Sequence, residues 1–196
     1  IIGDIQYDYK LALEAIKYGI HGLRINPGNI GSSQRVKEIV KDCKEKGISI
    51  RVGVNSGSIK KEYLEKYNGV NENSMVYSAL EQVRLLEELD FYDIKISLKA
   101  SNVPLTVKSY KKMSEICNYP LHLGITEAGP VWRGTIKSSV GIGTLLSMGI
   151  GDTIRISLTG DPVEEVKVGR EILKSLGLLK EGLELISCPT CGRTKI

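Results

Sequence analysis

Residues 48–55 read Ile-Ser-Ile-Arg-Val-Gly-Val-Asn, and this stretch decides the fold class. Residues such as Ile and Val favour strands, and successive side chains of a strand point to opposite faces. Apolar side chains therefore share one face, while Arg51, Gly53 and Asn55 share the other. The pattern predicts a strand that places a cation and small polar groups on a single face.

Similar short apolar runs recur along the chain, roughly 20–45 residues apart, with amphipathic stretches between them. This spacing is typical of βα units that feed a parallel sheet, because parallel strands need a long crossover connection. The predicted strands are residues 1–7, 22–26, 48–55, 92–99, 121–126, 153–159 and 183–187.

The stretches between the strands predict helices with recognisable ends. Ser33 is positioned to cap a helix over residues 34–46, and Gly47 provides its C-terminal stop. A second helix is predicted over residues 74–89. Asp161 followed by Pro162 opens a further helix that ends near residue 176. Residues 58–67 are expected to form a polar helical excursion on a loop.

Six consecutive βα units favour an α/β fold, either a TIM-like (β/α)8 barrel or an open doubly wound sheet. A complete barrel needs eight units and about 250 residues. We therefore expect an incomplete barrel over residues 1–182 and a second, truncated domain that begins at residue 183. The chain starts at Ile1 and first reaches a methionine at Met75, which we interpret as a fragment of a longer protein.

The composition excludes several classes of protein. Charged residues make up 26% of the chain and hydrophobic residues 41%, which is ordinary for a globular domain. No apolar run approaches the ~18 residues of a membrane span, and no signal peptide is recognisable. The net charge of +4 is too small to indicate nucleic acid, although it suits a small anionic ligand. Four cysteines are too few for a disulfide scaffold, so we expect a cytoplasmic protein.

Four predicted strands carry a cation where a parallel sheet is normally apolar. Because a buried cation costs several kcal/mol unless it is paired, converging cations need converging anions. Internal pairing with Asp4, Asp8, Glu127 or Asp152 would meet that need, but an anionic ligand accounts better for four cationic strands. Bidentate Arg with Asn and Ser donors suits phosphate oxygens. The candidate ligand-binding residues are Arg24, Asn26, Arg51, Asn55, Lys99, Arg155 and Ser157.

Glu127 follows a predicted strand and is a candidate proton donor or acceptor. Its alternative role is to balance the charge of a nearby cation. His122, within that strand, is interpreted as a hydrogen-bonded structural residue. Trp132 and Arg133 are expected in the following loop, where they could gate the site. The glycines of Gly141-Ile142-Gly143 are interpreted as close helix packing.

Cys188 and Cys191 form a Cys-x-x-Cys pair. Zinc and iron–sulfur sites need about four ligands, so this pair would supply half of a set and the remainder would lie beyond residue 196. Cys43 and Cys117 fall on apolar helix faces and are interpreted as buried hydrophobic residues.

Several motifs together resemble the 4-hydroxy-3-methylbut-2-enyl diphosphate synthase (GcpE) family. They run through the whole chain and form a highly specific combination. The motifs are residues 4–9 (DIQYDY), 23–31 (LRINPGNIG), 51–58 (RVGVNSGS), 122–129 (HLGITEAG), 151–158 (GDTIRISL), 161–166 (DPVEEV) and 186–192 (ISCPTCG).

The resemblance implies a TIM-like barrel followed by a small domain with a [4Fe–4S] cluster. It implies reductive opening of 2-C-methyl-D-erythritol 2,4-cyclodiphosphate in isoprenoid biosynthesis, with ferredoxin or flavodoxin as electron donor and a head-to-tail homodimer. Cys188 and Cys191 match two cluster ligands, and Glu127 matches the active-site glutamate. The family's first two barrel strands and its remaining cluster ligands are absent, and Gln6 replaces a frequent His. Residues that match diphosphate-binding positions are Arg24, Arg51, Asn55, Lys99, Arg155 and Ser157.

Two other hypotheses stay open. One is another phosphate-binding barrel enzyme of the dihydropteroate-synthase type. The other is a non-catalytic, zinc-binding fragment.

Overall fold

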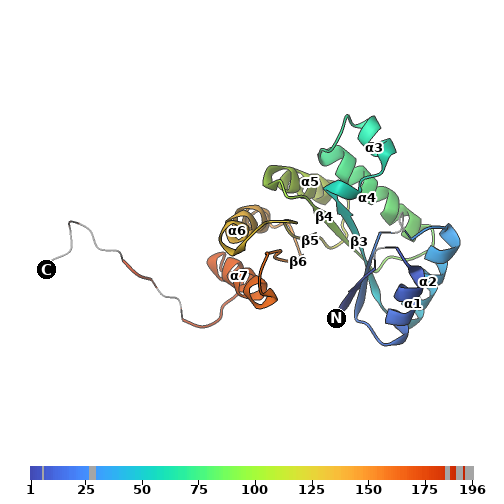
Figure 1. The fold of residues 1–196 in the computed structure, drawn as a ribbon, viewed down its shortest axis with the longest axis horizontal. Coiled ribbons are helices and arrows are strands. Elements are labelled where there is room, and N and C mark those ends of the chain that lie inside the picture. The colour runs from blue at the N-terminus through green and yellow to red at the C-terminus, as the bar shows by residue number, and fades with distance from the viewer. Residues whose placement is uncertain (6, 27–29, 184–185, 189–191, 193–196) are drawn as a thin grey trace.

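The computed structural model describes residues 1–5, 7–26, 30–183, 186–188 and 192. Strands alternate with helices from the N-terminus to residue 175 (Figure 1). The elements are β1 Ile2–Asp4, α1 Tyr9–Lys17, β2 Gly22–Ile25, α2 Ser33–Lys46, β3 Ser49–Asn55, the 3-10 turn η1 Ser56–Ser58, α3 Lys61–Lys66, α4 Glu72–Glu87, β4 Ile94–Lys99, α5 Val103–Ile116, β5 His122–Leu123, α6 Val131–Ser147, β6 Thr153–Ile154 and α7 Pro162–Ser175.

The described strands are parallel to their neighbours and follow the order of the sequence. The strands β1-β2-β3-β4 form one sheet, and β5-β6 form a second. A single bridge between Ile96 and Leu121 links the two sheets. This arrangement confirms the predicted parallel βα architecture. Parallel strands in sequence order are what an incomplete barrel should show.

Tyr110 of α5 explains why the sheet divides between β4 and β5. Its fully buried hydroxyl accepts a hydrogen bond from the Leu98 amide at 3.0 Å and donates one to the carbonyl oxygen of His122. In an unbroken parallel ladder, that amide and that carbonyl would bond to each other. The tyrosine therefore takes the place of a ladder bond and holds the two strands apart while keeping both backbone groups satisfied.

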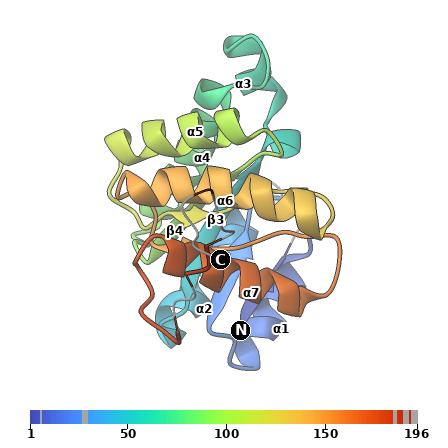
Figure 2. The same cartoon turned by 90° about the vertical axis from the view of Figure 1, so that its left-hand side faces the viewer.

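One face of the sheet forms the core beneath the helices. Alternate residues of β3, namely Ile50, Val52 and Val54, are fully buried, as are Ile96 and Leu98 of β4. Each such side chain contributes roughly 1.5–3 kcal/mol on burial, so this face stabilises the molecule while the opposite face is left for polar groups. Helices α5, α6 and α7 lie one below another on this outer side (Figure 2).

The helix ends agree with the sequence to within a few residues. Asp161 caps α7 through the Val163 amide at 2.9 Å, and Gly47 ends α2 in the left-handed conformation, with φ 63°. The predicted cap of α2 was wrong by one position, because Ser32 is the N-cap and Ser33 is already helical. Helix α4 begins earlier than predicted, at Glu72, because the Asn71 side chain accepts hydrogen bonds from the helix amides.

Several strand predictions were too long, among them the first, since β1 covers only residues 2–4 of the predicted 1–7. Strand β5 covers only residues 122–123 of the predicted 121–126, and β6 only 153–154 of the predicted 153–159. Beyond these short ladders the chain turns towards helices α6 and α7. Of the strand predicted over 183–187, residues 184 and 185 lie outside the described residues, and the rest form no strand.

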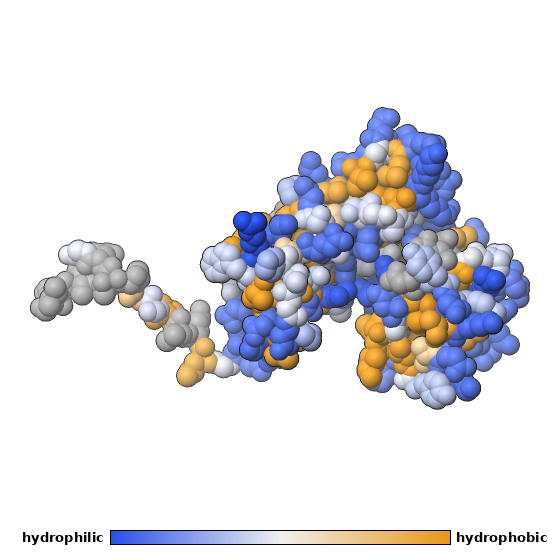
Figure 3. All heavy atoms as spheres, in the orientation of Figure 1, coloured by the Kyte–Doolittle hydropathy of each residue, from blue (hydrophilic) through white to orange (hydrophobic). Residues whose placement is uncertain are grey.

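No helix in the described part of the chain is long and apolar enough to cross a membrane. Exposed apolar side chains do gather near the N-terminus, on β1 and α1, where Ile1, Ile2 and Leu11 are exposed (Figure 3). The same view shows hydrophilic residues within a recess between the β1–β3 part and the α6–α7 part.

Candidate anion-binding site

The strand register aligns charged side chains on the sheet face opposite the core. Asp4 pairs with Arg24, Arg24 with Arg51, and Arg51 with Lys95. Residues paired across a sheet share a face, so these four side chains form one row across β1 to β4. Four positions further along, on the same face, Asn55 pairs with Lys99. The polar alternation in residues 48–55 is therefore shared by the neighbouring strands.

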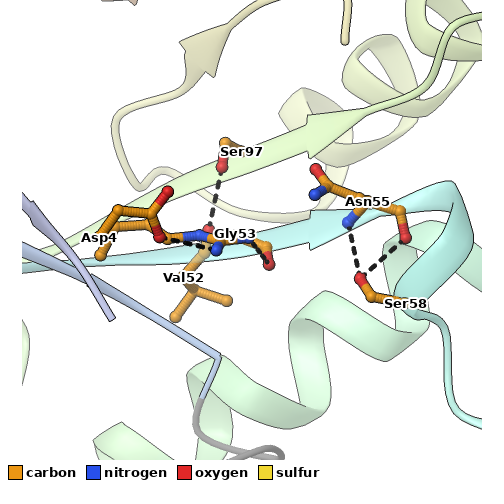
Figure 4. Close-up of polar contacts among 7 residues, drawn as sticks. Asp4, Val52, Gly53, Asn55, Ser58 and Ser97 are labelled. Carbon is orange, nitrogen blue, oxygen red and sulfur yellow. Dashed lines mark hydrogen bonds and ion pairs between the residues drawn. The ribbon is translucent and has the colours of Figure 1, made fainter. Parts of the chain in front are cut away.

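Arg24 is held by contacts on both sides of its guanidinium. Its Nη1 donates to Asp4 Oδ1 at 2.8 Å, and its Nη2 donates to the Gly53 carbonyl at 3.2 Å. A Cβ atom on Gly53 would lie only 2.5 Å from Arg24 Nε, so the glycine provides the space that this buried arginine occupies. Figure 4 shows Asp4 and Gly53 side by side on this face.

Arg51 and Lys99 form no ion pair with a described residue, and the same is true of Lys95 and Arg155. Arg51 Nε is buried and has no hydrogen-bond partner there. Burial and the charge of Arg24 lower the pKa of Arg51. Burial, followed by the charges of Arg51, Arg155 and Arg24, lowers the pKa of Lys99 to about 7. The cations of four strands thus act on one another, and their repulsion favours the neutral Lys99 amine.

Gly124 brings β5 close to Lys99. A Cβ atom at Gly124 would lie 3.2 Å from Lys99 Cε and 2.8 Å from the Arg155 carbonyl oxygen. The absence of a side chain therefore lets the Lys99 stem cross β5. Arg155 itself follows β6 and is exposed. Gly53 and Gly124 were missed as site residues, although glycine inside a strand is a signal for close approach.

Small polar groups accompany the cations. Asn26 is buried, and Ser157 is half-buried. The Ser97 hydroxyl donates weakly to the Val52 carbonyl at 3.5 Å (Figure 4). Where β3 ends, the Ser58 hydroxyl accepts from the Asn55 amide and donates to its carbonyl, each at 3.0 Å (Figure 4). These contacts fix the end of β3 and leave polar groups beside the cations.

Within the described ranges, the alternative of internal charge pairing is seen for Arg24. Asp8 caps α1 through the Lys10 amide, and Asp152 accepts a hydrogen bond from the Leu121 amide at 2.7 Å. Among described residues, the one ion pair that reaches the cationic face is that between Asp4 and Arg24. The excess positive charge on this face suits an anion.

Glu127 lies in the connection between β5 and α6, with an exposed side chain. Its backbone has φ 51°, in the left-handed region that costs a non-glycine residue about 1 kcal/mol or more. The turn is held on both sides: the Thr126 amide donates to the Ala100 carbonyl, and the Thr159 amide donates to the Gly129 carbonyl. A strained backbone kept in place by its neighbours is frequent at functional residues.

Other predicted features have mixed outcomes. His122 is hydrogen-bonded as expected, with Nδ1 2.8 Å from Thr153 Oγ1. Trp132 and Arg133 were wrongly placed in a loop, because both belong to the first turn of α6, where they are exposed.

The glycine and cysteine interpretations are each confirmed for one residue and not for the other. Gly141 packs tightly, since a Cβ there would lie 2.6 Å from Ile125, whereas Gly143 has open space around it. Cys43 is fully buried, as expected, while Cys117 is half-buried at the end of α5.

The cysteine pair is described only in part. Cys188 is exposed with a free thiol, and Cys191 lies outside the described residues. No group of three potential ligands gathers within the described ranges. Thiolates are the usual ligands of iron–sulfur clusters, so the donor type fits such a cluster, and the pair would supply two of its ligands.

The parallel βα order defines part of a barrel of the TIM type, a fold whose ligands bind where the strands end. Residues 1–170 match the GcpE TIM-barrel domain, and the chain belongs to this family.

Curated relatives agree with this assignment along the entire chain. The chain is 64% identical over 196 residues to the 4-hydroxy-3-methylbut-2-en-1-yl diphosphate synthase (flavodoxin) of Clostridium perfringens, covering 56% of that protein. It is 65% identical to the protein of the same name from Clostridium acetobutylicum, with the same coverage. For the Geobacillus kaustophilus protein, the identity is 58% and the coverage 52%. The chain thus spans about half the length of the relatives it matches.

Proposed function

We propose that this chain is the substrate-binding barrel of an enzyme that converts 2-C-methyl-D-erythritol 2,4-cyclodiphosphate to 4-hydroxy-3-methylbut-2-enyl diphosphate in the cytoplasm. The observation that carries the proposal is the group of cations on one sheet face, most of them without a carboxylate partner among the described residues. A cyclic diphosphate offers the anionic oxygens that this group needs. The names of the relatives supply the product, and the family resemblance implies the cyclic substrate.

In this proposal, Arg24, Arg51, Lys99 and Arg155 bind the two phosphates, while Asn26, Asn55 and Ser157 donate further hydrogen bonds. Bound phosphate would neutralise the mutual repulsion that lowers the pKa of Lys99. The protonated amine would then persist in the complex. The site therefore gains a full positive charge on Lys99 only when the substrate is present.

Glu127 is proposed to deliver a proton to the carbon-bound hydroxyl that leaves as water, while the ring oxygen departs as part of the diphosphate. General acid catalysis of this kind accelerates reactions by roughly 10²–10⁴. The backbone hydrogen bonds on both sides of Glu127 would keep its carboxylate in one place relative to the barrel. The reaction consumes two electrons and releases water, so a protonated leaving oxygen is required.

Cys188 and Cys191 would hold a [4Fe–4S] cluster together with ligands from elsewhere in the complete enzyme. When bound, that cluster supplies the two electrons. The relatives' name carries the word flavodoxin, which makes flavodoxin the proposed donor, with ferredoxin as the alternative. A homodimer, in which one subunit completes the other's site, is part of the same proposal.

Two variants of the complete enzyme test the assignment of binding and catalysis. Arg51→Ala should weaken cyclodiphosphate binding by about 2–4 kcal/mol, as for the loss of one partner in a buried charge pair. Arg84→Ala, on the outer surface of α4, is the matched control and should bind normally. Equal affinity of the two variants in calorimetry would overturn the site.

Glu127→Gln should lower kcat by about 10²-fold or more while changing KM little. A loss confined to substrate affinity would instead make Glu127 a binding residue.

A further inference from the structure

His122 lies between two groups of cations on the inner sheet face. It pairs in register with Thr153, and its neighbour Leu121 bridges to Ile96. This register places His122 beside Ser97, in the row between Lys95 and Lys99. Charges from both sides act on its ring, the largest from Lys99 and smaller ones from Arg51, Arg155 and Lys95.

Only one nitrogen of the His122 ring has a partner among the described residues. Nδ1 lies 2.8 Å from Thr153 Oγ1, whereas Nε2 is buried with no hydrogen-bond partner. Arg51 Nε is likewise buried with no hydrogen-bond partner among the described residues. A buried polar atom without a partner costs about 1–3 kcal/mol. Two such atoms beside these cations would both gain a hydrogen bond from an anion that binds this face.

The His122 ring stays neutral under physiological conditions. Burial, followed by the neighbouring positive charges, lowers its pKa to about 3. A neutral imidazole carries one proton, either on Nδ1 or on Nε2. The Thr153 hydroxyl can accept or donate, so its contact with Nδ1 survives in both tautomers. The choice of tautomer is therefore set by what faces Nε2.

The backbone of His122 is fixed at the point where β5 meets β4. Tyr110 donates a hydrogen bond to the His122 carbonyl and accepts one from Leu98, so β5 is tied to β4 at this residue. A ring anchored by Tyr110 at its backbone and by Thr153 at Nδ1 has little freedom to turn away. Its Nε2 keeps a constant position relative to the cations.

We propose that His122 is a neutral hydrogen-bond donor to the bound anion, and that anion binding moves the ring proton from Nδ1 to Nε2. With no anion, the surrounding cations favour a lone pair on Nε2. With an anion, a proton on Nε2 is favoured, and the ring releases its Nδ1 proton through the exposed Thr153 hydroxyl to solvent. The Nε2 proton is taken up from solvent as the anion enters, one proton for the one released, so the ring charge is unchanged. The inference rests on the proposed anion site.

Substitutions that mimic one ring nitrogen at a time test the donor role in the complete protein, with pyrophosphate as the probe. A Gln side chain places its amide near the position of Nε2, whereas Asn places its amide near Nδ1. His122→Asn should therefore raise the pyrophosphate Kd about tenfold, the equivalent of one hydrogen bond to an anion. His122→Gln should change it less than threefold. The exposed His21 provides the matched control His21→Gln.

Nitrogen-15 NMR of the histidine rings gives a second measurement that a purely structural histidine would not alter. The His122 signals are assigned by their loss in His122→Gln. On saturation with pyrophosphate, the Nε2 shift should move from that of a lone-pair nitrogen to that of a protonated nitrogen, and Nδ1 should move oppositely. The titration itself uses the unsubstituted protein, and His122→Gln serves only for assignment, so it decides the question even where His122→Asn does not fold.

The outcomes separate the two proposals. Wild-type binding of pyrophosphate with unchanged ring shifts, or equal Kd values for the Asn and Gln variants, overturns the role of His122 and leaves the anion site standing. Absence of wild-type pyrophosphate binding overturns the anion site and the role of His122 together.

Discussion

At the scale of single residues, the site depends on glycines as much as on cations. Arg24 occupies space that any larger residue at position 53 would fill, and the stem of Lys99 crosses the bare backbone of Gly124. Neither glycine has a positive φ, so they are required by close approach and not by φ. The positions of the charged groups are thus set by residues that carry no chemistry of their own.

Gly53→Ala tests this dependence. The added methyl group would displace the Arg24 guanidinium from Asp4 and from the Gly53 carbonyl, because 2.5 Å is too short a contact. Since that guanidinium is the end of a flexible side chain, we expect the protein to fold and the anion Kd to rise at least tenfold. Calorimetric titration with pyrophosphate measures the affinity, with Gly57→Ala, in open space, as the control. Unchanged affinity of Gly53→Ala would contradict the expectation.

Lys99 makes anion binding dependent on pH. Its pKa is about 7 in the free site, and a bound anion favours the protonated amine, so the pKa is higher in the complex. Affinity should therefore be full below pH 7 and fall as the pH rises above 7, by up to tenfold per pH unit. Calorimetry in two buffers of different ionisation enthalpy should reveal uptake of up to one proton at pH 8. Lys99→Met should abolish that uptake; its persistence would assign the proton to another group.

At the scale of elements, a helix side chain determines how two strands meet. Tyr110 projects from α5 into the gap between β4 and β5 and replaces one ladder hydrogen bond. The insertion holds β4 and β5 apart where Lys99, His122 and Gly124 gather. A buried hydroxyl with two satisfied contacts stabilises this opening without leaving backbone groups unpaired.

Tyr110→Phe should lower the free energy of unfolding by about 2–3 kcal/mol, because it leaves the Leu98 amide and the His122 carbonyl unsatisfied. Denaturant unfolding measures this change. The comparison variant Tyr119→Phe loses only a half-buried hydrogen bond to Glu87 and should cost less than about 1.5 kcal/mol. Equal losses would mean that β4 and β5 close directly once the hydroxyl is removed.

At the scale of the whole molecule, the two faces of the sheet have different roles. The apolar face binds the helices and stabilises the fold, whereas the opposite face collects positive charge that burial makes unfavourable. An anion that neutralises this charge binds the folded state alone. Ligand binding and stability are therefore linked.

Pyrophosphate at 100 times its Kd should stabilise the protein by about 2.7 kcal/mol. For a chain of this size, that corresponds to a rise in Tm of roughly 5–11 °C. Differential scanning calorimetry at constant ionic strength, with chloride in place of pyrophosphate as the control, measures the shift. Arg51→Ala should remove most of it, and an equal shift in that variant would contradict the proposed site.

The sequence by itself determined the parallel βα order, the helix ends and the identity of the cations. These features follow from periodicities of two and of about 3.6 residues and from capping residues, all of which are local. The family motifs are also runs of consecutive residues, so they too can be recognised in the sequence alone. Asp8, Asp152 and Glu127 were equally plausible partners for the cations, because sequence order carries no distances.

Only the tertiary structure decided that Asp4 pairs with Arg24, that Lys99 lies close to Gly124, and that Tyr110 divides the sheet. It also shortened β5 and β6 and moved Trp132 into a helix. Each of these features joins residues that are distant in sequence, and the register between strands sets their contacts. A one-residue shift of register would invert every face, so packing of the apolar face against the helices fixes which charges meet.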